Sequence, residues 1–282
     1  MQFKHVTVEF DAAVAIVRLD HQEVLNAVSV DMLQGLGDAL DAIDDRRAEV
    51  RCVVLTGTGR AFCTGANLQG RNNNDSPVRR NAGATLETAF HPFLRRVRHL
   101  HCPLVTAVNG PAAGAGMSFA LMGDIVVAAR SAYFLQAFRR IGLVPDCGST
   151  WLLPRLVGRA RALELSLLGE RLPAETALSW GLVNRVYDDA VLMPEAMKLA
   201  HDLANGPTVA LSLIRKLYWD SPENSFEEQI DLERQCQQQA GAAADFKEGV
   251  TAFLEKRPAV FRDKVSTDMP PYFPWWQDRD YK

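Results

Sequence analysis

The residues Leu104-Val-Thr-Ala-Val-Asn-Gly-Pro-Ala-Ala-Gly-Ala-Gly-Met-Ser118 carry the clearest structural signal in the chain. The first five form an apolar run rich in β-branched side chains, which predicts a buried strand. The run ends at Asn109-Gly110, and a series of small residues follows it. Small residues let a second segment or a ligand approach the main chain closely, particularly where a helix begins. We therefore predict a buried strand that leads through a Gly/Ala-rich turn into a helix.

The same alternation of strands and helices extends on both sides of this segment. Apolar runs predict further strands at residues 14–19, 50–55 and 125–129. Ser29 can cap a helix between the first two. Its apolar residues recur every three or four positions, on a face expected to meet the core, at Val30, Leu33, Leu36, Leu40 and Ile43. Strands and helices that alternate in this way favour an α/β architecture with parallel strands.

The composition is that of an ordinary globular protein. The chain has 282 residues, 48% of them apolar and 23% charged, and its 31 Lys and Arg against 34 Asp and Glu leave a net charge of −3. A chain of this length can bury a sizeable core without metals or disulfides. A net charge near zero lacks the basic field that nucleic acids and anionic membranes attract. We expect neither kind of partner.

The cysteines and the N-terminus both indicate a cytoplasmic protein. The five cysteines are an odd number, are spread along the chain and form no CxxC pair, so we expect them to be reduced. Lys4 and Glu9 stand where a signal peptide would be apolar. The longest nearly uncharged run, between Asn109 and Asp124, is shorter than the roughly 20 residues of a membrane span.

The chain divides into three parts. Residues 1–205 carry the alternating pattern, residues 206–264 have helical periodicity at 211–218, 226–239 and 246–254, and residues 265–282 form a tail rich in proline and aromatic residues. The prolines of the tail exclude a helix at 269–276, and its aromatic side chains suit packing on another surface, such as a neighbouring subunit. Within the first part, the polar and aperiodic residues 69–83 predict a surface loop or lid.

Two Gly/Ala-rich turns are candidates for chemistry. They are Ala61-Phe-Cys-Thr-Gly-Ala-Asn-Leu68 and the segment from Asn109 to Ser118 described above. Their main-chain N–H groups could together form an oxyanion hole. The small residues could equally serve only the tight packing of a helix against a strand. The residues of either turn alone leave both interpretations open.

Four segments, taken in order, resemble the enoyl-CoA hydratase/isomerase family, also called the crotonase family. They are Val24-Leu-Asn-Ala27, the turn at 61–68, Ala107-Val-Asn-Gly110 with Gly114-Ala-Gly116, and Gly142-Leu-Val-Pro-Asp-Cys-Gly148. The resemblance covers roughly residues 3–264. It implies a crotonase-type spiral of ββα units, a C-terminal helical region used for trimerisation, and an acyl-CoA thioester as substrate. The expected assembly is a homotrimer or a dimer of trimers.

The resemblance also assigns the site. It places the two oxyanion-hole N–H groups on Ala66 and Ala115, where each donor is typically worth about 2.7 to 4 kcal/mol in the transition state. We expect no metal and no tightly bound cofactor, with coenzyme A present as part of the substrate. Further substrate-binding positions fall on Val24, Asn26, Ala27, Thr64, Gly65, Asn67, Leu68, Gly110, Gly114, Ser118, Phe138 and Pro145.

The acid/base positions differ from those of a typical hydratase. Hydratases of this family carry glutamates at the positions that align with Ser118 and Phe138, and neither side chain can exchange a proton at neutral pH. Asp146 is the nearby carboxylate, and the stretch 137–154 resembles the phenylacetate-pathway isomerase branch, in which this aspartate is the acid/base. By itself an aspartate after proline is more often a turn residue. We expect Phe138, Leu143 and Trp151 to desolvate Asp146 and make it a better base.

Isomerisation through an enolate is the function that these residues favour. Alternatives are an enoyl-CoA hydratase that positions water with Asp146 and Ser118, a hydrolase or dehalogenase with Asp146 as nucleophile, and a catalytically silent acyl-CoA-binding protein. His99 and His101 near Cys102 match no compact metal-ligand spacing. The segment from Gly110 to Gly116 lacks the G-x-G-x-x-G order of a dinucleotide site. The acyl group cannot be deduced from the sequence.

Overall fold

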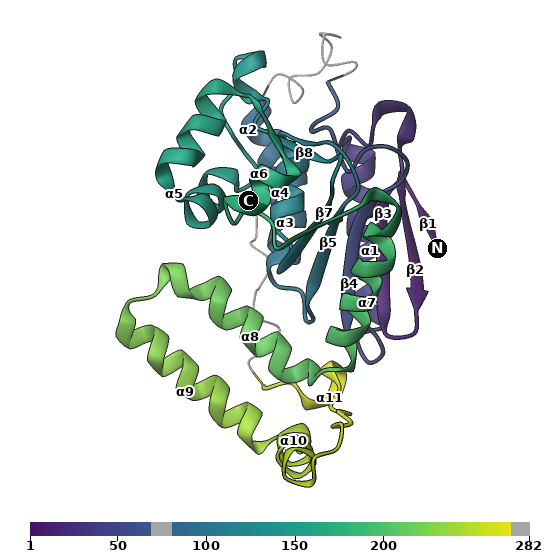
Figure 1. The fold of residues 1–282 in the computed structure, drawn as a ribbon, viewed down its shortest axis with the longest axis vertical. Coiled ribbons are helices and arrows are strands. Elements are labelled where there is room, and N and C mark those ends of the chain that lie inside the picture. The colour runs from purple at the N-terminus through teal and green to yellow at the C-terminus, as the bar shows by residue number, and fades with distance from the viewer. Residues whose placement is uncertain (69–80, 272–282) are drawn as a thin grey trace.

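A seven-stranded sheet forms the centre of the protein (Figure 1). The computed structural model describes residues 1–68 and 81–271. The first two strands are antiparallel to their neighbours, and all pairs from the third strand onward are parallel. In spatial order the strands are β1 (Gln2–Phe3), β2 (Val6–Asp11), β3 (Val14–Leu19), β4 (Cys52–Gly57), β5 (Leu104–Val108), β7 (Ile125–Ala129) and β10 (Arg185–Tyr187).

The four predicted strands all occur, one of them shifted by two residues, and the edge strands β1 and β10 were not predicted. Strands β3, β5 and β7 have the predicted bounds, whereas β4 begins two residues later than expected. Val50 is buried, but its N–H still donates to the carbonyl of Arg46, so it belongs to the turn that follows the preceding helix. Strand β2 was not predicted. Val6 and Val8 are buried while Glu9 is exposed, a half-buried pattern typical of a strand near a sheet edge.

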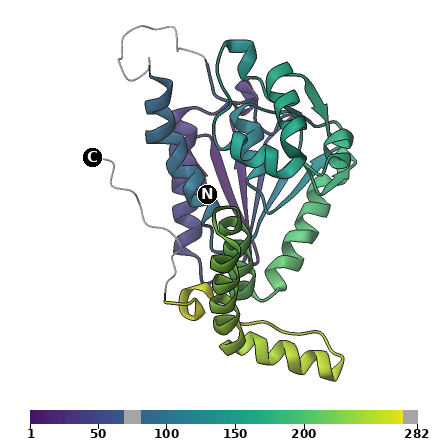
Figure 2. The same ribbon diagram turned by 90° about the vertical axis from the view of Figure 1, so that its left-hand side faces the viewer.

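Helices cover both faces of the sheet. Figure 2 shows α1 (Val30–Asp45) and α3 (His91–Arg98) on one side and α7 (Leu192–Asn205) on the other. Ser29 caps α1 as predicted, since its Oγ accepts a hydrogen bond from the Met32 N–H at 3.1 Å. Val30 was predicted to face the core and does not, because it is the first residue of the helix and is 62% exposed. The other four apolar positions of that pattern are buried.

A second, three-stranded sheet gives the chain its spiral form. It consists of β6 (Ala112–Ala113), β8 (Tyr133–Leu135) and β9 (Arg171–Pro173), and isolated bridges pair Cys63 with Ala112 and Val28 with Ala66. Three turns of chain repeat one order: a strand of the large sheet, a segment of the small sheet, then a helix. The helices are α2 (Ala82–Thr85) continuing into α3, then α4 (Ala115–Leu121), then α5 (Ser149–Leu168). This is the predicted succession of ββα units.

The C-terminal part is helical and projects from the spiral (Figure 1). As predicted, helices occupy the three periodic segments, with somewhat wider bounds. They are α8 (Thr208–Asp220), α9 (Phe226–Ala242) and α10 (Ala244–Glu255), followed by the short α11 (Val265–Asp268). The shorter helical elements of the chain are α6 (Ala174–Ser179) and η1 (Gln22–Val24), η3 (Leu86–Phe90), η4 (Phe138–Ile141), η5 (Asp189–Val191) and η6 (Ser221–Glu223).

One buried arginine joins α8 to the spiral. Arg215 donates to the carbonyls of Leu100 at 2.6 Å and Val97 at 3.3 Å, and it forms an ion pair with Asp124. The guanidinium also gives hydrogen-bond donors to two main-chain carbonyls that would otherwise be buried without a partner. These contacts position the helical region relative to the sheet.

Two predicted segments lie partly outside the described residues. Residues 69–80 of the expected loop are not described, and the loop ends earlier than predicted because Asn81 caps α2 through a 3.1 Å bond from the Ala84 N–H. The aromatic part of the tail from residue 272 is likewise not described. In the described ranges, none of the helices combines the length and apolarity needed to span a bilayer. All five cysteines are buried, and none of them forms a disulfide within the described residues.

Candidate active site

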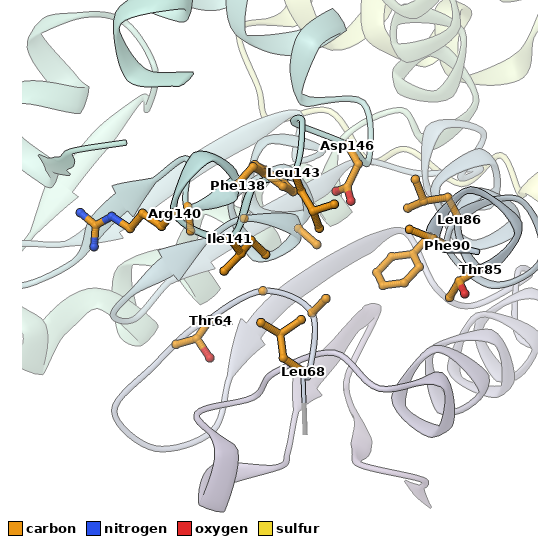
Figure 3. A pocket seen from close by; sticks show the side chains of 16 residues that line it. Thr64, Leu68, Thr85, Leu86, Phe90, Phe138, Arg140, Ile141, Leu143 and Asp146 are labelled. Atoms are coloured by element: carbon orange, nitrogen blue, oxygen red, sulfur yellow. The ribbon is translucent and has the colours of Figure 1, made fainter. Parts of the chain in front are cut away.

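A cavity of about 240 Å³ lies where the spiral, the small sheet and the helix containing α2 and α3 meet. Figure 3 shows its labelled side chains arriving from several elements that are distant in sequence. One wall is mainly main chain and the other is mainly side chain. The main-chain wall comprises Thr64, Gly65, Ala66, Leu68, Gly114 and Ala115.

Two glycines bring the two turns of the main-chain wall together. Gly65 has φ of 99° and Gly114 has φ of 52°, both in the region that favours glycine. A Cβ atom on Gly114 would lie only 3.8 Å from the Gly65 Cα, and a Cβ on Gly65 would lie 2.9 Å from the Ala113 carbonyl oxygen. The two turns therefore meet main chain to main chain. The next residue of each turn lines the cavity.

The amides of Ala66 and Ala115 are suited to bind an anion. Ala115 is the first residue of α4, so its N–H has no acceptor within the helix. The β-bridge between Val28 and Ala66 is formed by hydrogen bonds of the residues on either side of Ala66. The Val28 N–H donates to the Gly65 carbonyl and the Asn67 N–H to the Val28 carbonyl, both at 2.7 Å. Within the described residues, neither alanine amide donates to a main-chain carbonyl across the turns. Both remain available to a ligand oxygen.

Close packing fixes where α4 begins. A Cβ on Gly116 would lie 2.2 Å from the carbonyl oxygen of Cys63, so position 116 accepts no side chain. Cys63 itself is fully buried, and this burial raises the pKa of its thiol to about 12. The thiol is therefore protonated at neutral pH and is no nucleophile. The close contact between Cys63 and Gly116 holds the two turns together.

Asp146 lies in the segment between η4 and α5. It is half-buried and lines the cavity, and Figure 3 shows its carboxylate directed toward the space between Leu143 and Leu86. Cys147 and Gly148 follow with φ of 52° and 80°, which turns the chain sharply into α5. Burial, together with the charge of Asp146 and a hydrogen bond to it, raises the pKa of the Cys147 thiol well above its usual range. Cys147 is thus protonated beside the carboxylate.

The Asp146 carbonyl is held by three donors. The Ser149 hydroxyl lies 2.9 Å away, the Ser149 N–H 3.0 Å away and the Ser118 hydroxyl 3.3 Å away. Both serines are fully buried. The main chain of Asp146 is therefore constrained from two helices, α4 and α5, while its side chain faces the cavity.

Two further groups of residues complete the side-chain wall. From η4 and the segment after it come Ala137, Phe138, Arg140, Ile141 and Leu143. From the helix that begins at Ala82 come Ala82, Thr85, Leu86 and Phe90. The turn Leu86–Phe90 is π-helical, a form found frequently at functional sites. This second group was missed by the sequence analysis, although the four-residue spacing of Leu86 and Phe90 on an apolar face was a usable signal.

The site is mostly apolar around its single carboxylate. In the part of the chain that the structure describes, no second carboxylate lines the cavity. Arg140 donates through Nε at 3.2 Å and Nη2 at 2.7 Å to the Gly169 carbonyl beyond the end of α5. Figure 3 shows its guanidinium directed away from Asp146. Phe138 is 6% exposed, and its Cζ would lie 3.8 Å from a Cβ on Gly114.

The other predicted site residues do not line this cavity. These are Val24, Asn26, Ala27, Asn67, Gly110, Ser118 and Pro145. Asn26 is fully buried and ties the turn together, with Oδ1 accepting from the His21 N–H and Nδ2 donating to the Ala61 carbonyl, both at 2.8 Å. Gly110 lets its turn pass the Arg60 carbonyl, which a Cβ would approach to 2.4 Å. These two residues support the site from behind.

One residue that was expected to desolvate Asp146 does not line the cavity. Leu143 and Phe138 line the cavity with it, but Trp151 does not. Its ring stacks on Trp219 of α8, with centroids 5.7 Å apart and planes 10° from parallel. Trp151 therefore joins α5 to the C-terminal helices.

Comparison with known proteins supplies independent information. Residues 9–264 match the family model described as enoyl-CoA hydratase/isomerase. The chain is 45% identical to the 1,2-epoxyphenylacetyl-CoA isomerase of Escherichia coli K12 over 254 residues, covering 90% of this chain and 97% of that protein. It is 40% identical over 261 residues to a probable enoyl-CoA hydratase of Rhodobacter capsulatus, covering 93% and 99%.

Solved structures agree with the fold. A crystal structure of an enoyl-CoA hydratase subunit from Geobacillus kaustophilus superposes with a TM-score of 0.84 at 37% identity, over 93% of this chain and 99% of that one. An enoyl-CoA hydratase from Bacillus anthracis gives a TM-score of 0.85 at 30% identity, over 92% and 99%. The predicted fold class is confirmed.

Proposed function

The chain belongs to the enoyl-CoA hydratase/isomerase family, and on this premise we propose that it isomerises an acyl-CoA thioester through an enolate, with Asp146 as base and the Ala66 and Ala115 amides as oxyanion hole. One observation carries the proposal: among the described residues, a single carboxylate and two available main-chain amides line the same apolar cavity. This set can remove a proton and stabilise the charge that results. A proton shift requires no group beyond this carboxylate and these two amides.

The reaction needs one base used twice. The Asp146 carboxylate takes a proton from the α- or γ-carbon of the acyl group, and the electron pair of the broken C–H bond moves onto the thioester oxygen. The amides of Ala66 and Ala115 hydrogen-bond this oxygen, where each donor contributes roughly 10²- to 10³-fold to the rate. The protonated Asp146 then returns the proton to a different carbon. Base and acid are the same residue, so the shift is complete without added water.

Two positions favour isomerisation over hydration. The resemblance places hydratase glutamates at Ser118 and Phe138. The Ser118 side chain is turned away from the cavity onto the Asp146 carbonyl, and the buried ring of Phe138 occupies the wall beside Gly114. Adding water to a double bond needs a group that holds and deprotonates that water. Hydration by Asp146 alone remains the alternative, and the similarity to a probable hydratase is compatible with it.

The side-chain wall suits an apolar acyl group. Leu86, Phe90, Phe138, Ile141 and Leu143 surround the space in front of Asp146. The similarity to an isomerase of 1,2-epoxyphenylacetyl-CoA supports an acyl group that carries a ring. Coenzyme A is then part of the substrate and not a resident cofactor.

Exchange of protons for deuterium tests the enolate step directly. The enzyme is incubated in deuterated water with a panel of acyl-CoA esters, namely 3-enoyl, crotonyl, phenylacetyl and cyclohexenylacetyl thioesters, and deuterium uptake is followed by mass spectrometry. We expect uptake into at least one ester with the native enzyme and uptake at least about 10²-fold slower with Asp146→Asn. Tight binding of esters without any uptake would instead support a silent acyl-CoA-binding protein.

We also propose a homotrimer, alone or as a dimer of trimers. The C-terminal helices enclose a small core of Val209, Leu213 and Cys236, with a few partly buried residues against it. Large apolar side chains on these helices are exposed, including Phe226 at 76%, Phe253 at 82% and Leu254 at 73%. Exposed apolar surface of this extent marks an interaction site. Light scattering is expected to give three or six times the mass of one chain, and a stable monomer would contradict the proposal.

A further inference from the structure

Ser118 connects the two parts of the proposed catalytic site. It lies on α4 three residues after Ala115, whose amide is an oxyanion donor, so both residues sit on one turn of the same helix. Its hydroxyl donates to the Asp146 carbonyl at 3.3 Å. The residue that carries the base is thereby hydrogen-bonded to the helix that carries the oxyanion donor.

The orientation of the carboxylate depends on this peptide unit. Cys147 and Gly148 both adopt left-handed backbone angles, φ 52° and 80°, and glycine alone adopts such angles without strain. Across these two residues the Ser149 N–H closes a turn onto the Asp146 carbonyl at 3.0 Å. Fixing the Asp146 carbonyl with three donors therefore sets the direction in which the Asp146 side chain leaves the main chain.

Burial excludes a direct chemical role for Ser118. Its side chain is 0% exposed and does not line the cavity. It therefore cannot touch a substrate, position a water in the cavity or act as a nucleophile. Its hydroxyl can instead hold the main chain of Asp146 in place.

We propose that Ser118 is a positioning residue, which keeps the Asp146 carboxylate aligned with the oxyanion-hole amides by fixing the Asp146 carbonyl. The inference rests on the proposed function, because it assigns Ser118 a role only through Asp146. A small displacement of a general base from its reacting carbon costs rate without costing binding. The position at which the resemblance placed a hydratase glutamate thus serves, in this chain, to support a base located elsewhere.

The test is a graded series at position 118. Ser118→Cys keeps a weak donor, and Ser118→Ala removes it. With the acyl-CoA ester that the exchange screen identifies, we expect kcat to fall in the order Ser, Cys, Ala, by roughly tenfold for Ser118→Ala, with KM within about twofold. Ser212→Ala is the matched control, since Ser212 is equally buried on α8 and its hydroxyl has no partner among the described residues. It should leave kcat unchanged.

A double mutant separates positioning from a structural effect. In the Asp146→Asn background, Ser118→Ala should change the residual rate by less than about twofold, because the residue through which it acts is already disabled. A further loss of tenfold would overturn the inference, as would a native kcat in Ser118→Ala. Should Ser118→Ala fail to fold, Ser149→Ala, which removes the 2.9 Å donor to the same carbonyl, is expected to lower kcat alone.

The failures of the two proposals are distinguishable. Native activity in the Asp146→Asn variant would reject the proposed function. An inactive Asp146→Asn variant beside native kcat in Ser118→Ala would reject only the positioning role.

Discussion

The two walls of the cavity differ in what they are made of. On one side, Gly65, Ala66, Gly114 and Ala115 present main chain, and both glycines have a positive φ that a residue with a side chain adopts only with strain. On the other side, Asp146 and its apolar neighbours present side chains. The main-chain wall can stabilise an oxyanion whatever the alanine side chains are. The side-chain wall decides which proton moves and which acyl group fits, so one fold can support several reactions.

The largest expected effect lies on the side-chain wall. Asp146→Asn keeps the shape of the residue but removes the proton acceptor, and loss of a general base commonly lowers turnover about 10²- to 10⁴-fold. Acyl-CoA affinity should stay within a few-fold, since the amides and the apolar wall are unchanged. Steady-state kinetics and calorimetric titration measure the two quantities. Full activity in this variant would return Asp146 to the role of a turn residue.

The main-chain wall is tested by a change that displaces an amide. Gly65→Ala forces a φ of 99° on alanine and brings its Cβ 2.9 Å from the Ala113 carbonyl oxygen. We expect the turn to shift and the Ala66 donor to be misplaced, with a loss of kcat of roughly 10²- to 10³-fold. Ala115→Gly is the control, because it removes a side chain and retains the amide. If Ala115→Gly lost as much activity as Gly65→Ala, the wall would not act through its main chain.

The ratio of two reactions sharpens the contrast further. With one carboxylate among the described residues that line the cavity, the native enzyme should convert a 3-enoyl-CoA to its 2-enoyl isomer about 10²-fold faster than it hydrates crotonyl-CoA, because a missing second acid/base typically costs at least that factor. Ultraviolet absorbance of the conjugated thioester follows both reactions. Equal rates would give first place to the hydratase interpretation.

A double substitution examines the same point in reverse. Ser118→Glu with Phe138→Glu introduces carboxylates at the positions that the resemblance assigns to hydratases, and hydration should rise measurably above the native rate. Isomerisation should fall roughly tenfold in the same variant, because the Ser118 donor to the Asp146 carbonyl is lost. Both positions are buried, so the variant risks several kcal/mol of stability unless the new carboxylates find hydrogen-bond partners. Thermal unfolding of the variant is therefore measured beside its activity.

The smallest effect is expected from the acyl wall. Leu86→Ala removes a side chain from the π-helical turn that lines the cavity. A few missing methyl and methylene groups are worth roughly 10-fold in selectivity. We expect kcat/KM for small acyl groups to fall by about that factor relative to bulky ones. Leu178→Ala, an exposed leucine of α6 outside the cavity, should leave the ratio of kcat/KM values unchanged.

Much of the main-chain wall was predictable from local sequence. The strands at 104–108 and 125–129 follow from short apolar runs, and Ser29 caps its helix as its position predicts. The turns at Gly65 and Gly114 were identified because glycine is required where φ is positive or where two main chains touch. Such constraints involve only a few consecutive residues, so the local sequence is enough to predict them.

The side-chain wall was predictable only in part, because it depends on which residues converge in space. Asp146 was singled out by resemblance, but that it faces the same cavity as Ala66 and Ala115 is a property of the spiral. Ser118 aligned with a catalytic position and is instead buried against the Asp146 carbonyl. Trp151 was expected beside Asp146 and stacks on Trp219.

The sequence by itself determined the ββα order, the glycines that the turns require and the family to which the chain belongs. Tertiary structure alone decided which side chains meet around the carboxylate, including Leu86 and Phe90 from a helix that no motif marks. The physical reason is the separation along the chain of the residues that must interact. A turn or a cap is specified by a few neighbouring residues, whereas a cavity wall is specified by the packing of elements that are far apart in the chain.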